Sequence, residues 1–194
     1  TKLPELRTQI AAQLNSRGLH RDRVLALALH LIDLGYFRAG GEQYAEDNES
    51  YGVATLLCAH VRARGDVVSF DYPAKSGVQR TLEIQDPDVA RVVRALLRRG
   101  DQTDRLLVCR TSSGWVDLRA DDLNCRFKEL VGDEYSVKDL RTWHGTVLAA
   151  RSFALADPAV SQRVGKKVTS AVMKDVSEAL GNTPAVARSA YVDP

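Results

Sequence analysis

The residues best suited to chemistry are one tyrosine near the end of the chain and several cations upstream of it. Tyr191 ends the run LGNTPAVARSAY, residues 180–191. A phenol is a poor nucleophile at neutral pH, because its unperturbed pKa is about 10. It attacks a phosphodiester efficiently only when cations neutralise the phosphate and an acid protonates the leaving oxygen.

The upstream cations match these two requirements. Arginine forks suit the non-bridging oxygens of a phosphate, which makes Arg38 and Arg141 candidates for that role. A lysine on a hairpin could protonate the leaving 5′ oxygen, and Lys75 lies in the turn-like run PAKSG. Lys138 is a further cation close to Arg141. The chain holds 27 Lys and Arg residues, so a solvated surface charge is the default interpretation of any one of them.

Other polar residues are weaker candidates for a site. His30 lies in an apolar helix-like run, and we interpret it as a core histidine with a hydrogen-bonding partner. His20 and His60 have no Cys or carboxylate neighbours at ligand spacing. The acidic run at residues 46–49 resembles a metal motif only loosely, and we expect a solvated loop there. The sequence therefore predicts no metal site.

The composition is that of a globular protein with a sizeable core. The chain has 194 residues, of which 44% are hydrophobic and 27% charged. A net charge of +2 excludes a basic nucleic-acid tail but not a DNA-binding face, because clustering of cations matters more than their sum. The three cysteines are odd in number with no close pair, which argues against disulfides and favours a reducing cytoplasm. We expect neither a signal peptide nor a membrane span.

A mainly helical α+β fold with a small antiparallel sheet would position the candidates. We expect helices over residues 4–16, 21–34, 87–99, 119–131, 136–153, 158–180 and 184–191. We expect strands over residues 60–64, 67–72 and 78–84, which alternate apolar and polar residues and are separated by Gly-containing turns. This three-stranded sheet falls within residues 55–85 and puts Lys75 at a hairpin tip.

Turn residues mark the ends of the helices nearest the candidates. Asp86-Pro87 opens the helix after the sheet, because Pro is tolerated at the first helical position. Gly181 ends the long helix near the end of the chain, and Thr183-Pro184 caps and starts the last one. Tyr191 therefore falls at the end of a short final helix.

Several motifs in order resemble one family over nearly the whole chain. They are FRAGGEQY (37–44), YPAKSG (72–77), KDLRTWHGT (138–146) and SAYVDP (189–194). Together they resemble the catalytic domain of a type IB DNA topoisomerase of the compact bacterial and poxvirus-like kind. No single motif is strong, but the set in this order is.

The resemblance implies a role for each candidate. Arg38 and Arg141 correspond to the catalytic arginines, Lys75 to the general acid and Lys138 to an accessory cation. Tyr191 corresponds to the nucleophile that forms a 3′-phosphotyrosyl link, after which the 5′-hydroxyl strand rotates and is rejoined. The resemblance also implies that no ATP, metal or other cofactor is needed, because the covalent link retains the energy of the phosphodiester.

One position departs from the broader family pattern. Many relatives place a histidine nine residues before the nucleophile, where this chain has Asn182, although the bacterial kind commonly has Asn there. Asn can donate a hydrogen bond but cannot titrate, so we assign Asn182 to transition-state hydrogen bonding only. Related tyrosine recombinases carry their other histidine where this chain has Lys138, so we interpret His144 as a helix-packing residue.

Three further residues are candidates for DNA contact. Tyr44 matches a position that touches the DNA backbone in relatives, with loop packing as an equal alternative. Lys166 and Lys167 end the run RVGKK, which would contact phosphates or form a solvated basic face.

Two alternatives and several expectations complete this interpretation. The alternatives are a tyrosine recombinase or integrase, and a DNA-binding fragment with little activity. Relatives carry an N-terminal β-rich clamp domain, and we expect residues 1–194 to form the catalytic domain without it. We expect a monomer that binds double-stranded DNA in the cytoplasm, associated with the nucleoid. Without DNA, we expect Tyr191 or Lys75 to be displaced from the arginines.

Overall fold

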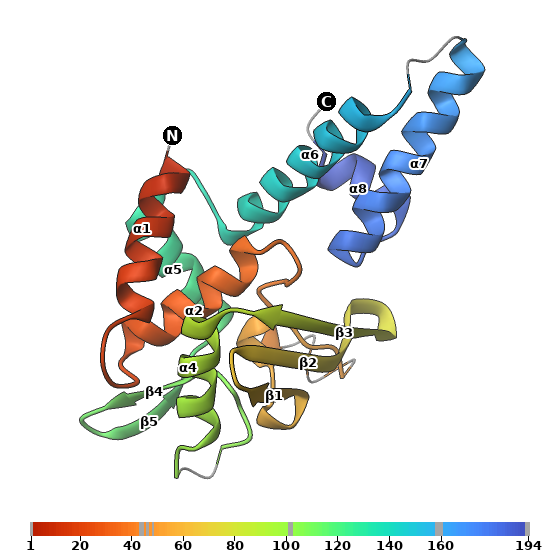
Figure 1. Cartoon of the computed structure of the whole chain (residues 1–194). Helices are drawn as coiled ribbons and strands as arrows, with labels where there is room; N and C mark the ends of the chain where they lie inside the picture. The colour runs from red at the N-terminus through yellow and green to blue at the C-terminus, as the bar shows by residue number, and fades with distance from the viewer. Residues whose placement is uncertain are drawn as a thin grey trace.

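The computed structural model describes residues 2–42, 45, 47, 49–100, 103–157 and 161–192. Its elements form two parts (Figure 1): a mixed α/β body up to α5, and a C-terminal lobe made of α6, α7 and α8 that projects from it. Each part has its own cluster of buried apolar side chains. The mainly helical α+β fold with a small antiparallel sheet is confirmed. Within the described residues, no helix combines the length and apolarity needed to cross a membrane.

The helices of the body surround one central helix. α1 (Lys2–Leu14) and α5 (Ala120–Val131) pack against α2 (Arg21–Asp33), which is buried on nearly all sides because its sequence is apolar almost all round. α4 (Pro87–Leu97) follows the sheet. The predicted start of α4 is confirmed, since the Asp86 carboxylate accepts hydrogen bonds from the backbone N–H groups of Asp88 and Val89.

The predicted sheet is confirmed as three antiparallel strands in sequence order. They are β1 (Val61–Arg64), β2 (Val67–Ala74) and β3 (Val78–Gln85). Alternate side chains of β2 enter the core, and the turn η3 (Lys75–Gly77) joins β2 to β3. Lys75 therefore lies at the hairpin tip, as predicted.

The sheet region is narrower than expected, and a second sheet was not predicted. Residues 55–60 lie outside the strands because the short 3-10 helices η1 (Val53–Thr55) and η2 (Cys58–His60) precede β1. β4 (Val108–Thr111) and β5 (Gly114–Asp117) form a separate antiparallel hairpin. Its strands are too short for periodicity to reveal, since four residues give only two alternations.

The C-terminal lobe consists of α6 (Val137–Leu155), α7 (Gln162–Leu180) and α8 (Pro184–Ala190). The residues 158–160 of the predicted long helix lie outside the described residues, and α7 begins after Ser161, whose hydroxyl accepts from Val164 N–H. Gly181 ends α7 in the left-handed conformation (φ 62°), and the Thr183 hydroxyl caps α8. Both predicted helix boundaries are confirmed.

Candidate active site

Arg141 lies at the junction of the body and the lobe. Its side chain is buried, with 3% of the residue exposed. One terminal nitrogen donates to the carbonyls of Phe37 (2.8 Å) and Gly35 (3.4 Å), and the other donates to the carbonyl of Leu180 (2.7 Å). Burial lowers the pKa of Arg141 from its ordinary value, while the nearby Tyr191 phenol acts in the opposite direction. The guanidinium therefore joins the segment before Arg38 to the end of α7.

Arg38 meets Asn182 at the same place. Its guanidinium donates to the backbone carbonyl of Gly181 (2.9 Å) and to the side-chain oxygen of Asn182. Residues 144 positions apart are brought together by this contact. The left-handed turn at Gly181 makes it possible, because it reverses the chain directly after α7 and points Asn182 back toward the body.

Two buried donors at this junction have no hydrogen-bond acceptor. They are Arg141 Nε and Asn182 Nδ2. Among the described residues, these are the buried side-chain nitrogen and oxygen atoms without a hydrogen-bond partner. A buried donor without a partner costs on the order of 1–3 kcal/mol, so native structures rarely keep one without a reason. A phosphate oxygen is an acceptor of the right charge for both atoms. The arrangement is therefore suited to binding an anion.

Tyr191 lies against Arg141 rather than away from it. The centroid of its ring is 5.2 Å from the guanidinium carbon of Arg141 and 5.8 Å from Nζ of Lys138. Its backbone N–H donates to the Ala187 carbonyl (3.1 Å), and its half-buried side chain packs on the apolar cluster of the lobe. Tyr191 is therefore not displaced from Arg141. Of the two displacements that we expected as alternatives, that of Tyr191 is not observed.

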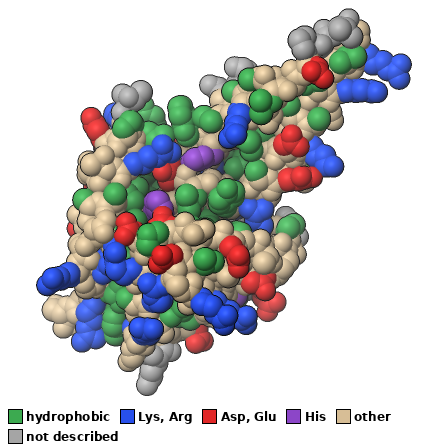
Figure 2. Space-filling view, in the orientation of Figure 1, with side chains coloured by type: hydrophobic (Ala, Val, Ile, Leu, Met, Phe, Trp, Pro, Cys, Tyr) green, Lys and Arg blue, Asp and Glu red, His purple; other side chains and the backbone are tan. Residues whose placement is uncertain are grey.

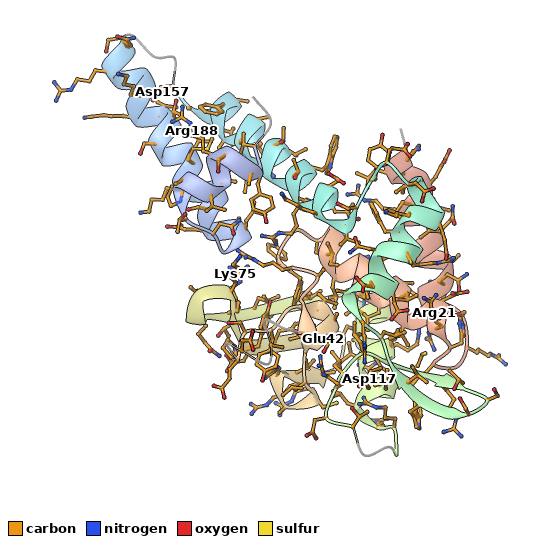
Figure 3. The ribbon with its side chains drawn as sticks, turned by 180° about the vertical axis from the view of Figure 1, so that it is seen from behind. Arg21, Glu42, Lys75, Asp117, Asp157 and Arg188 are labelled. Carbon is orange, nitrogen blue, oxygen red and sulfur yellow. The ribbon has the colours of Figure 1, made fainter. Side chains whose placement is uncertain are left out.

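Lys75 is exposed at the tip of the β2–β3 hairpin. Figure 3 shows it on the side of the sheet that faces the C-terminal helices. The structure thus brings Arg38, Asn182, Arg141, Lys138 and Tyr191 together, with the Lys75 hairpin beside them. A displacement of Lys75 from the arginines stays a prediction.

Sequence reasoning missed two residues at the site. Tyr72 is 2% exposed; burial raises the pKa of its phenol, whereas the charges of Arg80, Arg141 and Arg38 act to lower it. The positive charges of three guanidinium groups therefore act on the Tyr72 phenol. Arg80 is its partner across the hairpin. The sequence did contain a signal for both residues. Tyr72 falls on the apolar face of the predicted second strand, and the turn around Lys75 sets the register that pairs it with Arg80.

Two of the DNA-contact candidates, Lys166 and Lys167, lie apart from this site. Tyr44 falls outside the described residues. Lys166 and Lys167 are exposed on the outer half of α7, and Lys166 is about 21 Å along the helix axis from Leu180. Both lysines line an open groove of about 410 Å³ with Arg163. Figure 2 shows Lys and Arg side chains projecting from this end of the lobe.

The histidines have structural partners. His144 contacts Asp33 (Nε2 to Oδ1, 3.3 Å), and Arg7 binds the other oxygen of the same carboxylate (2.7 Å). Burial alone would raise the pKa of Asp33, but the His144 and Arg7 contacts lower it to about 2. This confirms His144 as a packing residue, which ties α6 to α1 and α2. His30 likewise contacts Asp86 (3.0 Å). Within the described ranges, no His, Cys, Asp and Glu side chains gather in a group that could hold a metal.

Comparisons with known proteins agree with the motifs. Residues 1–192 match the family described as "Eukaryotic DNA topoisomerase I, catalytic core". The chain is 25% identical over 196 residues to DNA topoisomerase 1B of Acanthamoeba polyphaga mimivirus, which covers 98% of this chain and 58% of that protein. It is 28% identical over 108 residues to DNA topoisomerase 1 of Mycosarcoma maydis, covering 54% of this chain and 10% of that protein. It thus spans less than two thirds of either relative. The chain belongs to the DNA topoisomerase I catalytic-core family.

Proposed function

We propose that this chain cleaves and rejoins one strand of duplex DNA through a 3′-phosphotyrosyl link at Tyr191, and so relaxes supercoils as a type IB topoisomerase. The observation that carries the proposal is the placement of the Tyr191 ring over the Arg141 guanidinium, beside two buried donors that lack an acceptor. A nucleophile next to an anion-binding site is what attack on a phosphodiester requires.

The proposed reaction assigns one step to each of these groups. The Tyr191 oxygen attacks phosphorus; an O–P bond forms, the phenol proton passes to solvent, and the bond from phosphorus to the 5′ oxygen breaks. Lys75 donates a proton to that 5′ oxygen. Rejoining is the reverse, with the 5′ hydroxyl as nucleophile and Tyr191 as leaving group. One phosphodiester is exchanged for another, so the cycle needs no energy source.

The cations stabilise the charge that builds on the phosphate. Both terminal nitrogens of Arg141 donate to backbone carbonyls, whereas its buried Nε has no acceptor and is available to a non-bridging oxygen. Asn182 offers Nδ2 in the same way, while its oxygen is held by Arg38. Lys138 adds positive charge over the Tyr191 ring. We expect each lost donor to slow cleavage by about 10²–10³-fold, as for other preorganised donors.

The decisive experiment traps the covalent intermediate. A duplex whose cleavage releases a short strand prevents rejoining, and the attached residue is then mapped by mass spectrometry. The wild-type chain should form an adduct at Tyr191, and Tyr191→Phe should form none. Tyr135→Phe is the control, because Tyr135 is exposed before α6 and packs against Lys2. An unchanged adduct in Tyr191→Phe would refute the assignment.

A second assay separates the proposal from site-specific recombination. A supercoiled plasmid that carries no recombination site should be relaxed without ATP. We further propose that the chain acts on duplex DNA as a monomer, which sedimentation of the protein–DNA complex would test. Cleavage without relaxation would instead favour a recombinase-like activity.

A further inference from the structure

Arg80 occupies a connecting position that neither the motifs nor the proposed reaction assigns. It lies on β3, three residues after the end of the turn that carries Lys75, and pairs with Tyr72 on β2. Figures 1 and 3 both show this hairpin tip beside the C-terminal end of α7. The Arg80 side chain spans from the sheet to that end of the helix.

The guanidinium of Arg80 donates to backbone carbonyls of two separate segments, the end of α7 and the segment that precedes Arg38. One terminal nitrogen donates to the carbonyl of Glu178 (3.3 Å), and the other donates to the carbonyls of Ala179 (3.1 Å) and Tyr36 (3.3 Å). The carbonyls of the last helical turn lack partners within the helix and carry the negative end of its dipole. The Glu178 carbonyl also accepts from the Gly181 N–H (3.2 Å), so Arg80 and this cap together hold the end of α7.

Three pieces of the active site meet at this one side chain. Tyr36 lies two residues before Arg38. Glu178 and Ala179 lie in the last turn of α7, and Asn182 follows on the turn after that helix. The hairpin that bears Arg80 carries Lys75. Gly181 packs directly on the guanidinium, since a β-carbon at residue 181 would lie 3.2 Å from its terminal nitrogen. Arg80 thus connects the hairpin that carries Lys75, the proposed general acid, to the turn that carries Asn182, a proposed hydrogen-bond donor to the phosphate.

We propose that Arg80 is a positioning residue, which sets the Lys75 hairpin against the α7 end so that the Lys75 ammonium reaches the leaving 5′ oxygen. The inference rests on the proposed function. In this proposal Arg80 acts through Lys75 rather than on the phosphate, because three backbone carbonyls hold its guanidinium against Tyr36 and the end of α7. Loss of Arg80 should therefore impair proton donation to the leaving group and leave the phosphate-binding donors in place.

A change of leaving group tests this directly. In one suicide substrate the scissile 5′ oxygen is kept, and in a second it is replaced by sulfur. A thiol has a pKa of about 8.5, so its thiolate departs without a proton donor. Arg80→Ala should cleave the oxygen substrate about 10²-fold more slowly than wild type, as expected for a misplaced catalytic group. It should cleave the sulfur substrate at close to the wild-type rate, and Lys75→Ala should behave in the same way.

Two further variants control for folding. Arg80→Lys keeps one donor group that can reach one carbonyl but loses the two-pronged guanidinium, so its rate on the oxygen substrate should be intermediate. If Arg80→Ala does not fold, the comparison of oxygen and sulfur substrates is made with Arg80→Lys. Arg91→Ala is the matched control, because Arg91 also donates to a backbone carbonyl, that of Leu14 (3.3 Å), in the body. It should cleave both substrates normally.

Each outcome decides the proposal. Equal slowing on oxygen and sulfur would overturn it, since a phosphate contact or general misfolding would not depend on the leaving group. Unchanged cleavage of the oxygen substrate by Arg80→Ala would also overturn it. If the wild-type chain forms no adduct with either substrate, the proposed function fails and the inference with it, whereas a wild-type adduct without sulfur rescue refutes the role of Arg80 alone.

Discussion

Gly145 on α6 faces the backbone carbonyl of Tyr191 so closely that a β-carbon at residue 145 would overlap that oxygen. The same β-carbon would lie 3.2 Å from a methyl group of Leu180. Because Gly145 has no side chain, the end of α8 packs directly against the backbone of α6 at this residue, one helical turn after Arg141. The nucleophile and its cation are held by the same helix.

Replacing this glycine should therefore displace the nucleophile. Gly145→Ala raises helix propensity by about 1 kcal/mol, so any loss must come from the clash with Tyr191. We expect single-turnover cleavage to fall by about 10²-fold, because a shift of about 1 Å in a reacting group has that effect. DNA binding measured by anisotropy should be unchanged. Gly100→Ala, where the added carbon would meet no atom within 4 Å among the described residues beyond its chain neighbours, should cleave normally. A Gly145→Ala enzyme of full activity would contradict this role.

The amide of Asn182 should be needed for its donor, not only for its shape. Asn182→Asp keeps an oxygen for Arg38 but replaces the unpaired Nδ2 with a negative charge that repels phosphate. Asn182→Ala removes the donor without adding charge. We expect cleavage to decrease in the order wild type, Ala, Asp, with the Ala variant slower by about 10²-fold. Single-turnover kinetics at saturating DNA would measure this, and an Asp variant faster than the Ala variant would exclude donation to the phosphate.

Stability at acidic pH should depend on Asp33. Its pKa is about 2 in the folded protein and 3.8 as the ordinary value. A depressed carboxyl pKa stabilises the fold above pH 3.8, and this contribution disappears as pH falls through 2. Between pH 5 and pH 2 the wild type should therefore lose about 2 kcal/mol more of its free energy of unfolding than Asp33→Asn. Urea unfolding of both proteins at the two pH values measures the difference, and equal losses would contradict the contacts with His144 and Arg7.

The outer half of α7 should contribute to DNA affinity through charge alone. If Lys166 and Lys167 each contact one phosphate, changing both to Gln should reduce the slope of log affinity against log salt by about 1.8. Fluorescence anisotropy over a salt series with one duplex gives that slope. The matched control changes Arg17 and Lys128 to Gln, which lie on the body and should leave the slope as it is. An unchanged slope in the α7 variant would make this face a solvated one.

Local sequence signals were sufficient for most of the fold. α2 is apolar almost all round and is buried, and the Asp86 cap, the Gly181 stop and the Thr183 cap act within a few residues of themselves. Such features depend on backbone geometry and neighbouring side chains, which a sequence displays directly. The hairpin of β4 and β5 escaped notice because its strands are short, and the residues before β1 form 3-10 turns rather than a strand.

The sequence by itself determined which side chains are able to perform the chemistry: a phenol at the end of a short helix, a lysine on a hairpin, two arginines and an asparagine in place of histidine. Only the tertiary structure decided which of their donors are already occupied. Arg141 binds carbonyls 104 and 39 residues away, and Arg80 binds one 99 residues away. Because backbone carbonyls are present at every residue, no sequence pattern indicates which of them will satisfy a guanidinium. That depends on how the body and the lobe pack together.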